Sequence, residues 1–288
     1  MAVLFCDTDC ELWYTTAREL DLKVIGMPYT VNGEEKLYDL GENTDFVGFF
    51  NQMKAGASVT TSGLNFDTYV DIFEPYFKEG QDILYVAFSS KMSGTFGPMQ
   101  QAVDALSEKY PSVRFKKFDT LNISMGTGLM VYLGAKEFIN NGGDIDKTYA
   151  YLESILNKVG IYFVVDDLKY LARGGRLSPS KAAFGNLMQL KPILRVGDEG
   201  EIDVYSKQQG SKKALKFMVD EFKKKYSPFD NAPITIVGAN NDKAVEEVKA
   251  QVQEFAPDAE IWVQPVGPVI GAHCGPGTCG IIYPSVSR

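Results

Sequence analysis

The residues of this 288-residue chain that could do chemistry are mostly small hydroxyls, together with a single histidine. Three consecutive hydroxyls, Thr60, Thr61 and Ser62, stand just before a predicted helix of residues 66–78. The N-cap of a helix uses one hydroxyl. The others are therefore available to bond a ligand.

A second polar loop, Ser89–Thr95, lies between an apolar run of residues 83–88 and a predicted helix that ends near Lys109. The apolar run is typical of a central parallel strand covered on both faces. Unpaired backbone N–H groups and the helix dipole favour an anion at the start of the following helix. Open α/β sheets bind ligands at the carboxyl ends of their strands. This loop is therefore a candidate anion site, and a well-capped helix without a ligand is the alternative.

His273 lies in the glycine-rich stretch Gly267–Gly280, with Val269-Ile270 before it and Ile281-Ile282 after it. Apolar pairs separated by glycines predict a tight hairpin or paired strands. Glycine also lets the backbone turn sharply or approach a ligand closely. A histidine on a turn without a chemical role is the alternative, but the surrounding glycines favour a functional one.

Arg173 and Arg176 bracket the turn Gly174-Gly175. Most surface arginines are simply solvated. In a chain with a net charge of −8, however, two arginines beside a turn could face an anion or an acidic partner.

Four cysteines occur as two pairs, Cys6/Cys10 and Cys274/Cys279. Their spacings are loose for a structural zinc site, even with His273 nearby. We expect no metal and no cofactor, and we expect Cys6 to be a small buried hydrophobe.

The elements that position these residues predict an α/β fold. Strand, helix and strand over residues 2–28 open an α/β unit, and a chain of this length suits two domains. We place the domains at residues 1–160 and 161–288. We expect residues 29–41 to be irregular, with a turn at Asn32-Gly33. Capping residues at 7–11 predict a helix that ends near Leu20. Further helices are predicted at 44–54, 66–78, 96–109, 126–140, 146–159, 166–172, 182–189, 211–226 and 242–255, and strands at 2–6, 23–28, 83–88, 113–118, 161–165, 191–196, 201–206, 234–238 and 261–264.

Composition excludes several classes of function. The pI of about 4.9 and the lack of a basic stripe argue against nucleic acid as a partner. The amino terminus has no basic region typical of a signal peptide, and no apolar run reaches the roughly 18 residues of a membrane span. We therefore expect a soluble, cytoplasmic protein without stable membrane insertion. The chain contains no Gly-Lys dipeptide and no Gly-x-Ser-x-Gly elbow, which favours a binding protein over an enzyme.

Taken in order, the motifs resemble those of the DegV family, the fatty-acid-binding proteins that serve bacterial fatty acid kinase, over nearly the whole chain. One departure is Gly63-Leu64-Asn65, where the family usually has a glutamine and a proline, so the loop there differs in shape. The matching residues are Thr61-Ser62, Ser89-Ser90, Ser93-Gly94-Thr95, Asp119-Thr120, Ser124, Gly126, Tyr170-Leu171, Gly174-Gly175-Arg176, Gly185, Lys191-Pro192-Ile193-Leu194, His273 and Gly275-Pro276-Gly277.

The resemblance implies an N-terminal parallel-sheet α/β domain and a C-terminal α/β domain with a mixed sheet, with a long-chain fatty acid in a tunnel between them. It implies that Thr61 and Ser93 bond the carboxylate, that Ser62 and the backbone N–H of Gly94 lie close, and that His273 stands nearby.

The same resemblance makes Arg173 and Arg176 candidates for contacting the kinase or the acyl phosphate. In that system a partner kinase subunit phosphorylates the bound carboxylate, and the binding protein carries both the acid and its acyl phosphate.

Two other functions remain open from the sequence. A serine-dependent lipid hydrolase or acyl transferase would use Ser93 as nucleophile and His273 as base, although no acid is obviously placed to orient the histidine. A sensor of a small phosphate ligand would use the same helix N-terminus.

Overall fold

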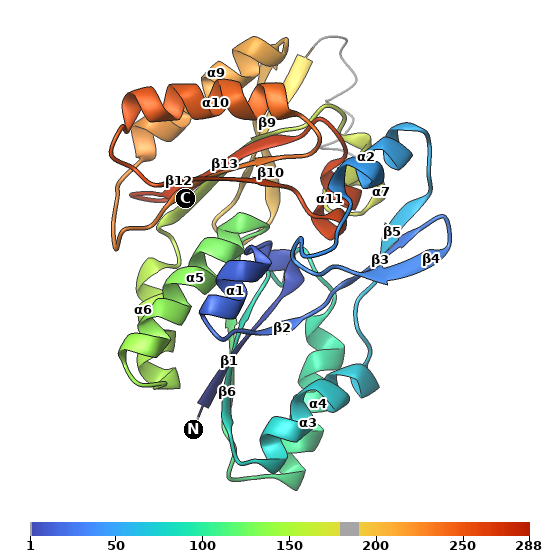
Figure 1. The fold of residues 1–288 in the computed structure, drawn as a ribbon, viewed down its shortest axis with the longest axis vertical. Helices are drawn as coiled ribbons and strands as arrows, with labels where there is room; N and C mark the ends of the chain where they lie inside the picture. Colours follow the sequence, from blue (N-terminus) through green and yellow to red (C-terminus); the bar gives the residue numbers. More distant parts are fainter. Residues whose placement is uncertain (1, 179–189) are drawn as a thin grey trace.

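The fold is given by a computed structural model that describes residues 2–178 and 190–288 (Figure 1). The helix predicted at residues 182–189, and Gly185 within it, lie outside the described residues. Within the described part of the chain, no helix has the length and apolar character needed to cross a bilayer.

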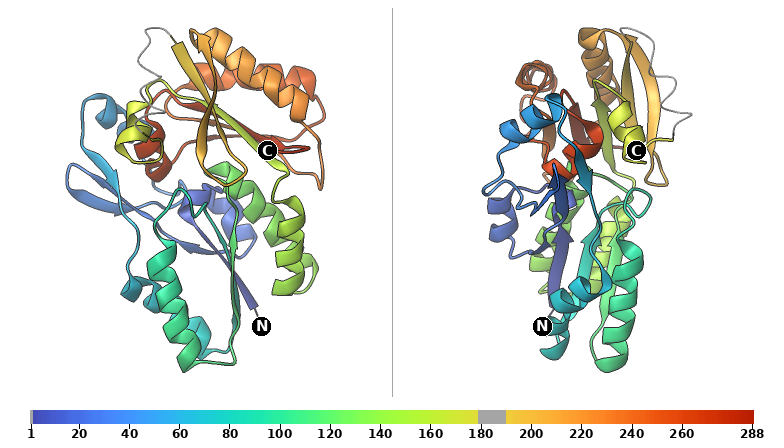
Figure 2. Two further views of the ribbon diagram at one scale, coloured as in Figure 1. Left: turned by 180° about the vertical axis from the view of Figure 1, so that it is seen from behind. Right: turned by 90° about the vertical axis from the view of Figure 1, so that its right-hand side faces the viewer.

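The N-terminal part is built on a parallel four-stranded sheet in the order β2-β1-β6-β7. Helices α3 and α4 pack together on one side of it, and α5 and α6 lie on the other (Figure 2, left). The strands are β1 (Ala2–Asp7), β2 (Lys23–Ile25), β6 (Asp82–Ala87) and β7 (Phe115–Asp119), and the helices are α3 (Phe66–Lys78), α4 (Phe96–Lys109), α5 (Met125–Asn140) and α6 (Ile145–Ile155). The apolar β6 is buried from its second residue onward, as expected of a central strand.

The C-terminal part is built on a mixed six-stranded sheet in the order β10-β9-β8-β13-β11-β12. Only β11 and β12 pair in parallel, and the other neighbours are antiparallel. Helices α9 and α10 cover one face (Figure 1). The bounds are β8 (Val159–Val164), α7 (Lys169–Arg173), β9 (Leu190–Val196), β10 (Ile202–Gln209), α9 (Ser211–Lys225), β11 (Ile234–Gly238), α10 (Asp242–Phe255), β12 (Ile261–Pro265) and β13 (Cys279–Pro284). The α/β class with one parallel and one mixed sheet agrees with the prediction.

A small antiparallel sheet, β4-β3-β5, extends from the body of the molecule and includes residues predicted to be irregular (Figure 1). Strands β3 (Pro28–Val31) and β4 (Glu34–Leu37) form a hairpin. Asn32 and Gly33 both have positive φ angles, 52° and 88°, as a two-residue hairpin turn requires. The expectation of irregular structure was wrong because all of β4 is exposed, so its sequence shows no apolar alternation. Helix α2 (Phe46–Lys54) then leads to β5 (Val59–Thr61).

The helix predicted to follow the capping residues 7–11 and to end near Leu20 is present but shorter than expected. Residues Thr8–Cys10 form a 3₁₀ turn, η1, and the helix α1 spans only Tyr14–Glu19. Glu11 ends the turn in the left-handed conformation, with φ of 57°, and its side chain is fully buried. The turn is buried beneath later parts of the chain. This burial, rather than the local run of helix-capping residues, decides its conformation.

The hairpin predicted for the glycine-rich stretch is instead a short helix, α11 (Pro268–Cys274), followed by β13. Pro268 occupies the first turn, where its fixed φ favours a helix. Gly271 packs so closely on Phe50 that an added Cβ would lie 2.8 Å from its ring. The glycines therefore let a helix approach α2, while only the apolar pair Ile281-Ile282 belongs to a strand.

Gly128 in α5 provides a test of how closely this helix packs against the turn η1. A Cβ at Gly128 would lie 2.3 Å from the backbone carbonyl oxygen of Cys10. Backbone cannot move aside as a side chain can, so we expect Gly128→Ala to lower the free energy of unfolding by about 3 kcal/mol, measured by urea denaturation. The control is Gly97→Ala in α4, where nothing lies within 4 Å of the added atom. That variant should be neutral or slightly stabilising, and equal stabilities for the two variants would contradict the packing argument.

Candidate functional site

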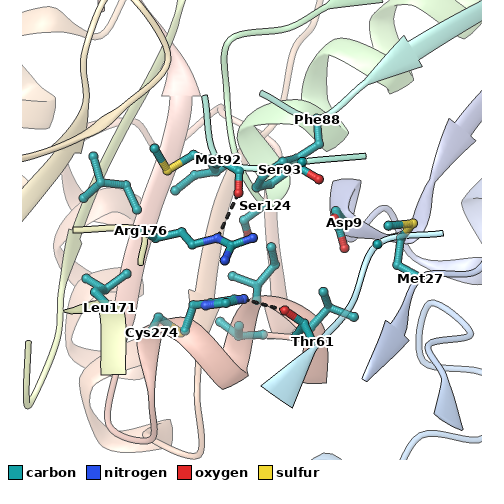
Figure 3. Close-up of a pocket in the computed structure, with 18 of the residues that line it drawn as sticks. Asp9, Met27, Thr61, Phe88, Met92, Ser93, Ser124, Leu171, Arg176 and Cys274 are labelled. Atoms are coloured by element: carbon teal, nitrogen blue, oxygen red, sulfur yellow. Dashed lines mark hydrogen bonds between the residues drawn. The ribbon is translucent and has the colours of Figure 1, made fainter. Parts of the chain in front are cut away.

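A cavity of about 400 Å³ lies between the two large sheets and is lined by residues from both parts of the chain (Figure 3). This volume is within the ~300–1,000 Å³ of ordinary small-molecule sites. Much of the wall is apolar, and representative side chains are Met27, Phe88, Ile161, Phe163, Ile202 and Val237.

The five residues predicted to bind the ligand all line this cavity: Thr61, Ser62, Ser93, Gly94 and His273. Thr61 ends β5, Ser93 lies in the loop before α4, and His273 lies in the last turn of α11. Ser62 and Gly94 are exposed, whereas Thr61, Ser93 and His273 are half-buried. The fold therefore brings together groups that are up to 212 positions apart in the chain.

Thr61 Oγ1 and His273 Nε2 are joined by a hydrogen bond of 2.8 Å. Burial, and then the charges of Arg176 and Arg173, lower the pKa of His273 from 6.5 to about 4, so the imidazole is neutral at pH 7. In the tautomer with hydrogen on Nε2, the ring donates to Thr61 and leaves the threonine O–H to point elsewhere. The buried Nδ1 has no hydrogen-bond partner among the described residues.

Gly174 lies directly against the imidazole. A Cβ on Gly174 would come within 2.1 Å of His273 Nδ1. This glycine, one of the pair recognised in the sequence, therefore provides the space that the histidine ring occupies.

Ser93 is held at the start of α4. Its Oγ accepts a long hydrogen bond of 3.4 Å from the backbone N–H of Thr95. Since a hydroxyl both accepts and donates, its hydrogen remains available for a ligand in the cavity. Helix α4 has no side-chain cap at its first turn, so the N-terminus favours a negatively charged group.

The two arginines predicted to act together lie in different surroundings. Arg176 lines the cavity, and it donates from Nε to the Met92 carbonyl at 2.9 Å and from Nη1 to the Gly174 carbonyl at 2.6 Å. Arg173 is exposed at the end of α7 and does not line the cavity. Its guanidinium lies 5.3 Å from the centre of the Tyr170 ring. Only Arg173 is therefore placed to meet a macromolecular partner directly.

Three buried acids that sequence reasoning treated as helix-capping residues lie beside the site. Asp7 accepts hydrogen bonds from the Tyr85 hydroxyl at 2.5 Å and from the Asp9 N–H at 3.0 Å, and burial raises its pKa to about 6. Glu11 accepts from the Gly267 N–H at 2.5 Å and from the Ser124 hydroxyl, and burial raises its pKa to about 8. Asp9 lines the cavity itself. Their position directly after an apolar strand of a parallel sheet is the signal that could have identified them.

Glu11 makes stability depend on pH in a defined direction. Its pKa is raised from 4.5 to about 8 on folding, so the folded state is most favoured below pH 4.5 and loses stability as pH rises through about 8. Glu11→Gln keeps an acceptor for the Gly267 N–H and removes the ionisation. We expect the variant to match the wild type near pH 4.5 and to be more stable at pH 9 by on the order of 4 kcal/mol. Urea denaturation across this range measures the difference, and a variant less stable at every pH would refute the argument.

Comparisons with known proteins place the chain in context. The model of the DegV family, described as uncharacterised proteins, matches residues 2–285. A DegV domain-containing protein of Clostridium perfringens is 34% identical over 281 residues, which cover 98% of this chain and 96% of that protein.

Solved structures extend the similarity to three dimensions. A fatty-acid-binding DegV family protein from Streptococcus agalactiae is 26% identical, with a TM-score of 0.84 over 98% of both chains. A DegV family protein from Eubacterium eligens, loaded with heptadecanoic acid, shares the fold with a TM-score of 0.82 at 16% identity, over 99% of this chain and 100% of that one.

Proposed function

The chain belongs to the DegV family, and we propose that it binds one long-chain fatty acid in the cavity between its two large sheets. The observation that carries this proposal is the cavity itself. Its wall is mainly apolar, and Thr61, Ser93 and His273 meet in it from three distant segments. The fatty-acid-binding relative from Streptococcus agalactiae supports the same conclusion. We further propose that the ligand lies between two domains that divide near residue 160.

We propose that Thr61 and Ser93 donate hydrogen bonds to the carboxylate, with the Ser62 hydroxyl and the Gly94 backbone N–H close by. A buried carboxylate is costly unless it is hydrogen-bonded, and hydroxyls satisfy it without a permanent opposite charge. The bond between His273 Nε2 and Thr61 Oγ1 orients the threonine hydroxyl toward the ligand.

The acyl tail supplies most of the affinity on this proposal. Burial of each methylene is worth about 0.8 kcal/mol, so ~14 methylenes give a gross ~11 kcal/mol before the cost of ordering the chain. A hydrogen bond to a charged group contributes only about 1.5–3 kcal/mol. The tail therefore determines affinity, and the hydroxyls determine how the head group is oriented.

We also propose that the protein presents the bound acid to a fatty acid kinase subunit, which phosphorylates the carboxylate to an acyl phosphate. The exposed Arg173 lies on the segment that also carries Arg176 into the cavity, so a partner docking there would be near the head group. Because the kinase reaction uses ATP, this proposal places the protein in the cytoplasm.

The geometry favours binding over catalysis by Ser93. The hydrogen bond of His273 Nε2 goes to Thr61 rather than to Ser93, and among the described residues no acid bonds its Nδ1. The nucleophile, base and acid of a hydrolase are therefore not assembled. The apolar wall likewise favours a lipid over a small phosphate ligand.

Mass spectrometry of lipid extracted from the purified protein tests the proposed function. We expect a long-chain fatty acid at close to one molecule per chain. Protein that carries no lipid, binds none on addition and hydrolyses esters would contradict the proposal and support the hydrolase.

Arg173→Ala tests the kinase interaction. We expect the variant to retain its fatty acid and to lower the rate of acyl phosphate formation at least tenfold, since removing a charge that docks a partner commonly costs about 1.4 kcal/mol or more. The rate is measured with purified kinase subunit and ATP. Arg18→Ala, at an exposed arginine paired with Glu42, is the control. An Arg173 variant that turns over like this control would remove Arg173 from the proposal.

A further inference from the structure

Asp9 lies on the wall of the cavity without a hydrogen-bond partner for its Oδ1 among the described residues. The residue is only 6% exposed. Figure 3 shows it on the other side of the site from Arg176, next to Met27. A buried carboxyl oxygen that lacks a partner is costly. Because Asp9 also lines the cavity, its carboxyl group is placed to bond something that enters it.

The fold places Asp9 at the same edge of the parallel sheet as the loop that carries Ser93. Strands β1 and β6 are parallel neighbours, with Phe5 opposite Tyr85, and adjacent strands lie only about 4.8 Å apart. The turn Thr8–Cys10 and the loop Ser89–Thr95 therefore leave the sheet side by side. Asp9 on the first and Ser93 on the second both line the cavity.

The groups around Asp9 disfavour its charged form. The acids on its own segment, Asp7 and Glu11, repel a negative charge, and Arg176 across the cavity attracts it. The phenols of Tyr69 from α3 and Tyr85 from β6 also interact with Asp9. Burial is the largest influence, and together with the two acids it raises the pKa of Asp9 well above its ordinary value. Asp7 and Glu11 have hydrogen-bond donors of their own, whereas Asp9 Oδ1 has none among the described residues.

We propose that Asp9 is a neutral carboxylic acid that donates its proton in a hydrogen bond to the carboxylate of the bound fatty acid, and that it thereby makes fatty-acid affinity depend on pH. This inference rests on the proposed function. It adds an acidic residue to a proposed head-group site otherwise composed of hydroxyls, a backbone N–H and an imidazole. An ionised Asp9 in the same place would repel the ligand.

The direction of the pH dependence follows from this arrangement. The bound carboxylate is ionised, and its presence keeps the proton on Asp9. Below the pKa of Asp9 in the empty protein, binding involves no proton. Above that pKa, binding requires uptake of one proton, so affinity falls by up to tenfold for each pH unit.

The experiment measures palmitate affinity of delipidated protein from pH 6 to pH 9.5 for the wild type and for Asp9→Asn. The amide of asparagine can still donate but cannot ionise. We expect the wild type to lose affinity toward high pH more steeply than the variant, because Glu11, with a pKa of about 8, titrates in both proteins. At the highest pH the affinity of the variant should exceed that of the wild type at least tenfold. Asp119→Asn is the matched control. Asp119 ends β7 in the same sheet, and its Oδ1 accepts from the N–H groups of Ser90 and Leu121 outside the cavity. This control should keep the wild-type profile.

A second measurement needs no variant. Calorimetry in two buffers with different protonation enthalpies gives the number of protons taken up on binding. We expect the wild type to approach one proton per palmitate at the upper end of the pH range. No uptake there, or equal pH profiles for the wild type and Asp9→Asn, would overturn the role of Asp9 while leaving fatty-acid binding intact. A wild type that binds no palmitate at any pH would overturn both proposals.

Discussion

Ile161→Trp is expected to abolish retention of long-chain fatty acids while leaving the protein folded. Ile161 lies in β8, in the interior of the mixed sheet, and its side chain lines the cavity. The indole would fill space that the acyl tail needs. If the variant excludes five methylenes at about 0.8 kcal/mol each, affinity falls by about 4 kcal/mol, or roughly a thousandfold.

The control for this variant is Ile161→Leu, which conserves volume and should keep its lipid. Bound fatty acid is quantified by mass spectrometry, and folding is followed by thermal unfolding. A tryptophan variant that accepts only shorter acids would support the assignment of the cavity. One that purifies with the same long-chain acid as the wild type would show that the tail does not pass Ile161.

The double substitution Thr61→Val with Ser93→Ala is expected to weaken fatty-acid binding by about a hundredfold or more. Each hydroxyl donates to the carboxylate on our proposal, and a hydrogen bond to a charged group is worth about 1.5–3 kcal/mol. Valine keeps the shape of threonine at the end of β5, so the loss reports on the hydroxyl. Affinity is measured by competition with a fluorescent fatty acid.

A series of chain lengths separates the head group from the tail in this experiment. Each methylene should still change affinity about fourfold in the double variant, since ~0.8 kcal/mol per methylene comes from the apolar wall. Ser90→Ala is the control, because Ser90 is exposed in the same loop and does not line the cavity. A double variant with unchanged affinity would place the carboxylate elsewhere.

Several elements were predictable from local sequence because their apolar residues repeat with a regular period. Helices α3 and α10 and strand β11 have the predicted bounds. Each buries its apolar positions, so the local pattern and the tertiary packing agree. The regular apolar spacing of these elements made them recognisable in the sequence.

The wrong secondary-structure predictions concern segments whose conformation is decided by long-range packing rather than by the local sequence pattern. Strand β4 is held by pairing with β3, and its exposed residues show no alternation. Helix α11 replaces the expected hairpin because Gly271 lets it pack closely against Phe50 of α2 and because Pro268 occupies its first turn. In both cases the contact that decides the conformation comes from a different segment of the chain.

The sequence by itself determined the fold class, the order of the motifs and the hydroxyls, histidine and one arginine, Arg176, that line the cavity. Those features depend on residue types and on short-range spacing. Only the tertiary structure decided that Thr61 bonds His273, that Arg176 faces the cavity while Arg173 faces outward, and that Asp9 is a buried acid on its wall. These last facts depend on which side chains meet across the two sheets. The burial and the neighbouring charges that raise the pKa of Asp9 and lower the pKa of His273 exist only once those sheets have packed.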